Sequence, residues 1–250
     1  MTRLGTLTWL ARTGGRLAWY DKLTMIAQGV QARLATQGRR RAGKKLRNRE
    51  VSEILPPDSA IAREAVAMAK DCSPPYLFNH CLRAYFWARL LDADTRPFDD
   101  EAVFVALMLH DLGLTERWRL RGQELHCFTA VGARTAAELA TRHQWSDARA
   151  YLAANAITLH LNVTVGDEHG QEAQMVRAGS GGDVAGLGLD VLARDQIVQV
   201  VERYPRLGLK TEVVGPLMTE ANERPCCRIA FLCRSLGFAA LIQGNRIFSE

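Results

Sequence analysis

Three polar side chains stand in otherwise apolar helical stretches, and together they could bind a metal ion. His110 and Asp111 follow the apolar run 102–109 within the sequence LMLHDLGLTE. A buried carboxylate costs several kcal/mol unless a cation or hydrogen-bond donors pair with it. A divalent cation would neutralise Asp111 and use the neighbouring imidazole as well. His80 lies on a second predicted helix, where it shares a face with Ala84 and Trp87, and it could supply a further ligand.

Simpler interpretations of these residues exist. A histidine on an apolar helix face is more often a core residue whose hydrogen bonds are satisfied, and Asp111 could cap a helix or pair with a core arginine. Adjacent helical side chains diverge by about 100°. His110 and Asp111 can therefore share an ion only if the ion lies between their directions, near the helix surface.

The elements that must position these residues are predicted to be helices. Proline pairs, N-capping Asp and Ser residues and apolar periodicity predict the boundaries. Asp58 or Ser59, Asp99 or Asp100, and Ser146 are the expected caps. The predicted helices cover about 60–71, 76–92, 99–113, 127–145, 146–162, 193–205 and 224–242. Period-two alternation is almost absent, so the fold class is all-α. Residues 162–190 are the least regular stretch and are predicted to form a long loop, which is often functional in a compact domain.

The charge of the chain is divided between an arm and a body. Residues 1–50 carry twelve Lys and Arg against two acids, a net charge of +10, and the remainder carries −5. We expect residues 1–52 to form a basic N-terminal arm or appended helices that supply no metal ligand, and 53–250 to form the main domain with a C-terminal helix. The arm could contact nucleic acid or an anionic membrane, or it could be a solvated helix face.

Composition excludes several other classes of protein. No apolar run reaches the ~18–20 residues that a transmembrane helix needs. The six cysteines show neither zinc-finger spacing nor the density of a secreted disulfide scaffold. We therefore expect a cytoplasmic protein with reduced thiols and no membrane span, which could form oligomers.

The order of these residues resembles the HD-domain superfamily of metal-dependent hydrolases. His80 comes first, His110-Asp111 follow, and a distant aspartate completes the pattern. Five segments are similar to the cyanamide-hydratase-like branch, across about residues 53–206: LPPDSAIAREA, PPYLFNHCLRAYFWARLL, EAVFVALMLHDLGLTE, NAITLHLNV and RAGSGGDVAGLG…VVERYPR. The resemblance implies an all-α HD-domain helical bundle with a metal site in its core.

The resemblance also implies the ligands of one divalent metal ion, with zinc expected first and iron, manganese or nickel as alternatives. The ligands would be His80, His110, Asp111 and Asp183, with Asp190 as the rival for the last position. Asp183 follows two glycines that would let the backbone approach the site closely. Such a cation lowers the pKa of bound water toward ~7, so that a metal-bound hydroxide can attack a small molecule.

Three further residues match family positions near the substrate. His160, within AITLHLN, would donate a proton or polarise the substrate, although it could also be a buried structural histidine. Thr115 would orient the substrate, or equally cap the helix end. Thr129 is expected to bind substrate, because it stands where the hydratases typically have a pocket glutamate.

One departure from the hydratases concerns the substrate. Where they typically read Phe-Glu-x-Asp-Gly-Ala, this chain reads CFTAVGA, so that Thr129 replaces the glutamate and Val131 the aspartate. Glu124 and His126, just upstream, could substitute for the lost acids. We therefore expect a working hydrolytic centre with weak or no cyanamide activity and a different small substrate.

Two alternatives to a small-molecule hydrolase or hydratase remain. The first is an HD-type phosphohydrolase of phosphate esters or nucleotides, and the second is a non-enzymatic metal-bound domain whose arm binds a partner. A phosphate substrate should bring Lys or Arg into the cleft. The core segments offer little beyond Arg83 and Arg117, which favours a small neutral substrate. The intact ligand set argues against a non-enzymatic domain.

Overall fold

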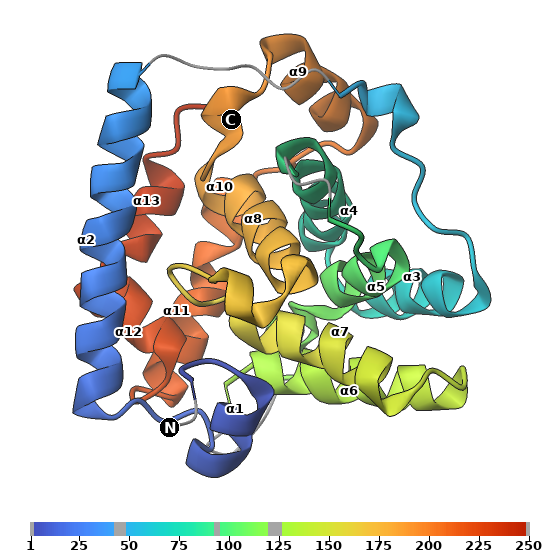
Figure 1. The fold of residues 1–250 in the computed structure, drawn as a ribbon, viewed down its shortest axis with the longest axis horizontal. Coiled ribbons are helices and arrows are strands. Elements are labelled where there is room, and N and C mark those ends of the chain that lie inside the picture. Colours follow the sequence, from blue (N-terminus) through green and yellow to red (C-terminus); the bar gives the residue numbers. More distant parts are fainter. Residues whose placement is uncertain (1–2, 43–48, 93–95, 120–126, 249–250) are drawn as a thin grey trace.

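The computed structural model describes residues 3–42, 49–92, 96–119 and 127–248 (Figure 1). Within these ranges the regular structure is helical, and the β-structure consists of an isolated bridge between Arg16 and Cys227. The predicted all-α fold class is confirmed. The α-helices are α1 (Leu7–Thr13), α2 (Trp19–Ala42), α3 (Ala60–Cys72), α4 (Pro75–Leu91), α5 (Asp100–Leu109), α6 (Thr129–Arg142), α7 (Asp147–Leu159), α8 (Gln171–Ala185), α9 (Arg194–Arg203), α10 (Leu209–Glu212), α11 (Val214–Glu223), α12 (Arg228–Ser235) and α13 (Phe238–Gln243).

Three of the helices that hold the core begin at predicted caps. The hydroxyl of Ser59 accepts the backbone N–H of Ala62 at the start of α3, and the hydroxyl of Ser146 caps α7 in the same way. A carboxylate oxygen of Asp99 accepts the N–H of Ala102 at 3.0 Å and starts α5. These caps satisfy N–H groups that a helix leaves unpaired at its first turn, which is why the pattern is readable from sequence.

The prediction of one C-terminal helix over 224–242 is wrong. The segment divides into α12 and α13 at Leu236 and Gly237. Gly237 has φ +69°, a left-handed conformation that ends a helix and that glycine adopts without steric cost.

The prediction of an irregular loop over 162–190 is also wrong, because most of its second half is the helix α8. Helices α4 and α8 lie side by side in the centre of the molecule (Figure 1). The glycines of RAGSGGDVA serve close packing here. A Cβ atom on Gly179 would lie 2.1 Å from the carbonyl oxygen of Ala84 in α4. The absence of a side chain at Gly179 therefore sets the separation of the two helices.

Replacing Gly179 by alanine should destabilise the protein by about 1–3 kcal/mol, the usual cost of overpacking a core. The new methyl group must push α8 away from α4, because the backbone of α4 cannot move aside at low cost. Thermal or urea unfolding measures the change. Gly29→Ala in α2 is the matched control, since no atom lies within 4 Å of its added Cβ, and it should be neutral or slightly stabilising. Equal stability of Gly179→Ala and wild type would contradict this account of the packing.

Helix α1, the first helix of the basic arm, packs against the main domain. The N–H of Leu7 donates to Oδ1 of Asn155 in α7 at 2.9 Å, and Trp9 is buried. Helix α2 runs along one edge of the molecule, where the buried Met25 belongs to the same apolar cluster as Ile229 of α12 and Ile242 of α13 (Figure 1). In the part of the chain that the structure describes, no helix is both long and apolar enough to cross a membrane.

Candidate metal centre

The HD dipeptide lies where helix α5 ends. The α-helix stops at Leu109, and Asp111 has φ −106° and ψ 9°, outside the helical range, before a 3₁₀ turn at Leu112–Leu114. This break in the helix lets two adjacent side chains face the same point. Nε2 of His110 lies 3.3 Å from Oδ2 of Asp111.

His80 joins this pair from α4. Its Nε2 lies 3.1 Å from Nε2 of His110 and 3.4 Å from Oδ2 of Asp111. The exposed fractions of His80, His110 and Asp111 are 0, 1 and 6%. One ligand atom from each of the three residues falls within 4.8 Å of the others. The spacing and the donor types fit a bound metal ion.

Hydrogen bonds on the far side of each ring fix the tautomers. Nδ1 of His80 lies 2.8 Å from Oδ2 of Asp183, and Nδ1 of His110 lies 2.8 Å from the carbonyl oxygen of Leu107. Both partners can only accept, so both Nδ1 atoms carry the proton. The two Nε2 atoms then face each other at 3.1 Å, a contact that either a proton on one ring or a metal ion between the two lone pairs would satisfy.

The electrostatics of the cluster favour a cation. Burial works against charge on both rings, but hydrogen bonds to Asp111 and Asp183 raise the pKa of His80, and the charge of Asp111 raises the pKa of His110 to about 10. Burial also opposes ionisation of Asp111, yet the charge of His110 holds the pKa of that carboxyl well below its usual range. A metal ion would compete with protons for the same lone pairs.

Asp183 lies outside the group of three, behind His80. It sits in α8, and its carboxylate accepts a bidentate pair of hydrogen bonds from Arg83, both 2.8 Å. Nε1 of Trp87 donates to it at 2.7 Å, and Nη1 of Arg206 at 3.2 Å. With both oxygens engaged in this way, Asp183 is placed to orient His80 for a metal, as acceptors behind metal-binding histidines commonly do.

Asp190, the rival for the last ligand, lies in the 3₁₀ turn Leu189–Val191 and is not part of the cluster among the described residues.

His160, the residue that follows the end of α7, lies beside the cluster. Its Nε2 lies 3.8 Å from Oδ1 of Asp111, and its ring meets that of His110 edge to face, with centroids 4.9 Å apart. Nδ1 of His160 lies 2.7 Å from the carbonyl oxygen of Ile157, so Nε2 again carries the lone pair. Burial, together with the charge of His110, lowers the pKa of His160 to about 3, and the ring is neutral at physiological pH.

A cavity of about 490 Å³ is lined by residues that neighbour the clustered side chains in sequence, while His80, His110 and Asp111 themselves do not line it. Leu77 lines it one turn before His80, and Thr115 lines it four residues after Asp111. Thr115 is buried, and its hydroxyl donates to the carbonyl oxygen of Leu112 at 2.7 Å. The expected substrate threonine is therefore at the cavity, and it also closes the turn after the HD dipeptide.

The structure does not bring Thr129 to this cavity. Thr129 is fully buried at the start of α6, where Nη2 of Arg228 approaches its hydroxyl at 3.4 Å. Val131 packs in the main apolar core. Acids at these two positions would therefore be buried in this chain, which gives a physical reason for their replacement. Glu124 and His126 lie outside the described residues.

An acid that the sequence analysis missed does line the cavity. Glu220 of α11 is 2% exposed, and Oε1 accepts the N–H of Phe128 at 2.9 Å. Burial and the neighbouring Cys127 raise the pKa of Glu220 to about 7, against the effect of Arg224. Nothing in the chain around Glu220 marks it, because it reaches the site only through the packing of α11 against the start of α6.

Of the two arginines that pair with Asp183, Arg83 could be expected near the site from the sequence, since it lies three residues after His80 and so shares its helix face. No pattern in the sequence places Arg206 there.

Comparison with known proteins agrees with this geometry. The sequence model of the HD domain matches residues 77–205, a little more than half of the chain, and this range holds all of the clustered residues. A search of curated proteins finds no significant match. On the family match, the chain belongs to the HD-domain family of metal-dependent hydrolases.

Proposed function

We propose that this protein is a hydrolase that holds one divalent cation on His80, His110 and Asp111 and acts on a small, largely uncharged molecule. The observation that carries the proposal is the buried convergence of these three residues, with the tautomers of both rings fixed by partners behind them. Three protein ligands leave coordination positions open, as catalytic sites require.

The side chains around this site would have different roles. A cation held there would polarise the substrate and lower the pKa of a bound water to about 7. Asp183 keeps Nε2 of His80 directed at the site. The neutral Nε2 of His160, 3.8 Å from Asp111, would accept a hydrogen bond from the water or substrate during proton transfer. Zinc suits imidazole and carboxylate ligands, and two histidines with one carboxylate also suit iron.

The charges that line the cavity support an uncharged substrate. Glu116, Arg119 and Glu220 are its charged residues, and Arg119 already pairs with Glu223 outside it. Binding of a phosphate group there would be unfavourable, because the cavity has two acids and one arginine that is already paired. Cyanamide belongs to the preferred class by size and charge, but its dedicated hydratases typically carry the acids that Thr129 and Val131 replace here. We propose a different small substrate, with Glu220, which also pairs with Arg224, at the cavity wall to exchange a proton.

A phosphohydrolase is the alternative, and one residue favours it. Arg228 is fully buried and close enough to His160 to lower its pKa. The Nε atom of Arg228 has no hydrogen-bond partner among the described residues. A buried guanidinium with a donor to spare could bind a phosphate oxygen, provided that substrate reaches it.

The test is elemental analysis followed by a substrate screen. Protein loaded in turn with zinc, iron, manganese and nickel is assayed on small nitriles and amides, on aryl phosphate mono- and diesters, and on nucleotides. We expect one metal ion per chain and metal-dependent turnover of neutral molecules, with cyanamide a poor substrate. Robust phosphoester cleavage without activity on neutral molecules would establish the alternative, and efficient cyanamide turnover would show that the missing acids are dispensable.

His160→Ala should keep the metal and lower kcat by about 10²–10⁴-fold, the usual contribution of a positioned acid or base. Metal content after dialysis and turnover of the best substrate from the screen are measured on the same samples. His143→Ala is the matched control, because His143 pairs with Glu64 away from the cluster and should leave kcat unchanged. Loss of the metal from His160→Ala would instead make His160 a fourth ligand.

A further inference from the structure

Helix α2 has two opposite faces that differ in what covers them. One face packs on the body through Met25, which is fully buried, and through Asp21, which is 5% exposed. The opposite face is turned away from α12 and α13 along the edge of the molecule (Figure 1). With 24 residues, α2 is about 36 Å long, so this outer face is extended.

The outer face carries large apolar side chains in one stripe. Each is at least 44% exposed, and their spacing of three or four residues keeps them in line along the helix. The residues are Trp19, Leu23, Ile26, Val30 and Leu34. Single exposed apolar residues are common on soluble proteins, but a continuous stripe marks a surface that binds something.

The charge that the sequence places on α2 and on the residues after it indicates what that partner is. Residues 19–49 contain nine Lys and Arg and one acid, Asp21, which is buried. Lys22 and Arg33 are exposed on the helix itself. The rest of the chain, from residue 51 on, is net acidic, because the arm accounts for the whole positive charge. A partner for this face must therefore combine an apolar interior with negative charge at its surface.

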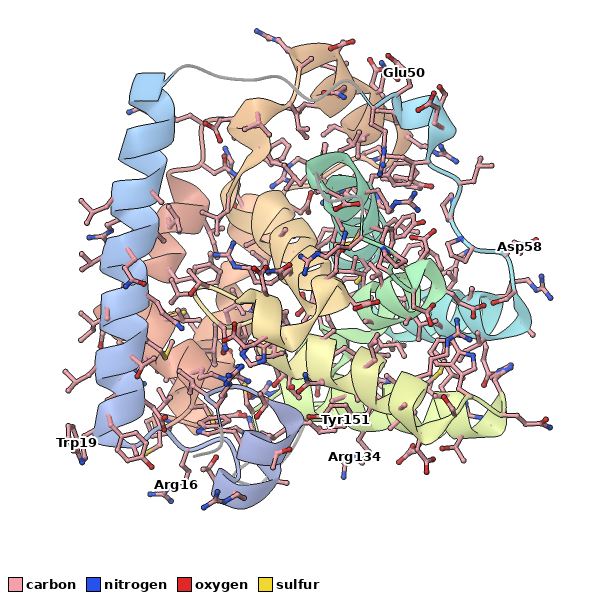
Figure 2. All side chains as sticks on the ribbon, viewed as in Figure 1. Arg16, Trp19, Glu50, Asp58, Arg134 and Tyr151 are labelled. Carbon is pink, nitrogen blue, oxygen red and sulfur yellow. The ribbon has the colours of Figure 1, made fainter. Side chains whose placement is uncertain are left out.

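We propose that the outer face of α2 binds the surface of an anionic lipid bilayer, with the helix lying in the plane of the interface. Leu, Ile and Val side chains would enter the boundary of the acyl chains, while Lys and Arg contact the phosphates, as in interfacial amphipathic helices. Figure 2 shows Trp19 pointing outward at the N-terminal end of α2. Its neighbour Tyr20 is 58% exposed, and such amphipathic aromatic rings favour the level of the lipid headgroups.

A second copy of the chain fits this face less well. Two stripes packed together would bring two strongly basic helices side by side, and like charges across an interface oppose association. Lipid phosphates neutralise the same charges. The charge of the arm therefore favours the bilayer over a dimer.

The test is co-sedimentation of the full-length protein with vesicles. One set is phosphatidylcholine alone, and the other is an equal mixture of phosphatidylcholine and phosphatidylserine. We expect binding to the mixed vesicles, weaker binding as salt is raised, and little binding to phosphatidylcholine. The variant L23E/V30E places two carboxylates in the stripe and should weaken binding by about tenfold or more. Both positions are exposed, so the fold should tolerate the change.

The control variant T24E/Q31E makes the same change of charge at the same seven-residue spacing, on exposed positions outside the stripe. It should bind mixed vesicles far better than L23E/V30E does. Equal losses in the two variants would show that charge alone acts and that the stripe has no role. Wild-type protein that binds neither vesicle would overturn the proposal. A dimer detected by light scattering without lipid would also overturn it if L23E/V30E were monomeric, because a second copy would then cover the face.

Discussion

Asp111→Ala is expected to remove both the metal and the activity while leaving the protein folded. Asp111 brings the negative charge that makes a cation favourable between His80 and His110, and its oxygens face three imidazoles. A bound metal supplies several kcal/mol of transition-state stabilisation. Since each 1.4 kcal/mol is a factor of ten in rate, we expect turnover to fall by about 10³-fold or more. Elemental analysis after dialysis and circular dichroism establish metal content and folding on one preparation.

Asp190→Ala is the matched control for this change. Asp190 is the aspartate expected from the sequence as the rival of Asp183 for the last ligand position, and it lies in a turn and is not part of the cluster among the described residues. It should retain the metal and nearly full turnover. Full metal content in Asp111→Ala would show that the three-residue centre is wrong.

Asp183→Ala should cause the largest loss of stability. Its carboxylate pairs with Arg83 and Arg206 and accepts from Trp87, and the side chains of all these residues are 4% exposed or less. Removing one partner of a buried ion pair costs about 3–5 kcal/mol, because the remaining charge is left unpaired. Domains have only about 5–15 kcal/mol of stability, so the variant should unfold at a much lower urea concentration.

Asp71→Ala provides the comparison in urea unfolding. It removes a carboxylate that pairs with Arg117, but both side chains are more than half exposed. Exposed pairs contribute about 0–1 kcal/mol, so the urea midpoint should hardly move. A loss below about 1 kcal/mol in Asp183→Ala would mean that the network around Asp183 is not a structural requirement.

The substitution Asp183→Asn distinguishes between two roles for Asp183, that of a metal ligand and that of the residue that orients His80. An amide cannot accept at both of its ends, and here both oxygens face donors. If Asp183 orients His80, the folded fraction of Asp183→Asn should still bind the metal, about 10–100-fold more weakly.

The parts of the fold that could be predicted from sequence are those with local causes. Ser59, Asp99 and Ser146 start their helices through hydrogen bonds to residues three positions along the chain. Apolar periodicity between such caps is a local pattern as well. Helix α8 was missed because its glycines lower helix propensity, and the close approach of α4 that explains Gly179 is a tertiary contact.

The candidate site shows the same division. His80, His110 and Asp111 were identified because polar residues in apolar helices are conspicuous in a sequence. The position of Asp183 on the far side of His80 was not predictable, since it depends on which face α8 turns to α4. Glu220 lies 109 residues after Asp111 and reaches the cavity only by packing, so no spacing rule could find it.

The most direct test of the metal centre is an anomalous difference map from crystals of the metal-loaded protein, collected at the absorption edge of the bound metal. We predict one peak within bonding distance of Nε2 of His80, Nε2 of His110 and a carboxylate oxygen of Asp111, with Asp183 still hydrogen-bonded to Nδ1 of His80. A peak coordinated by Asp183, or loaded crystals with no peak between the two imidazoles, would contradict the account.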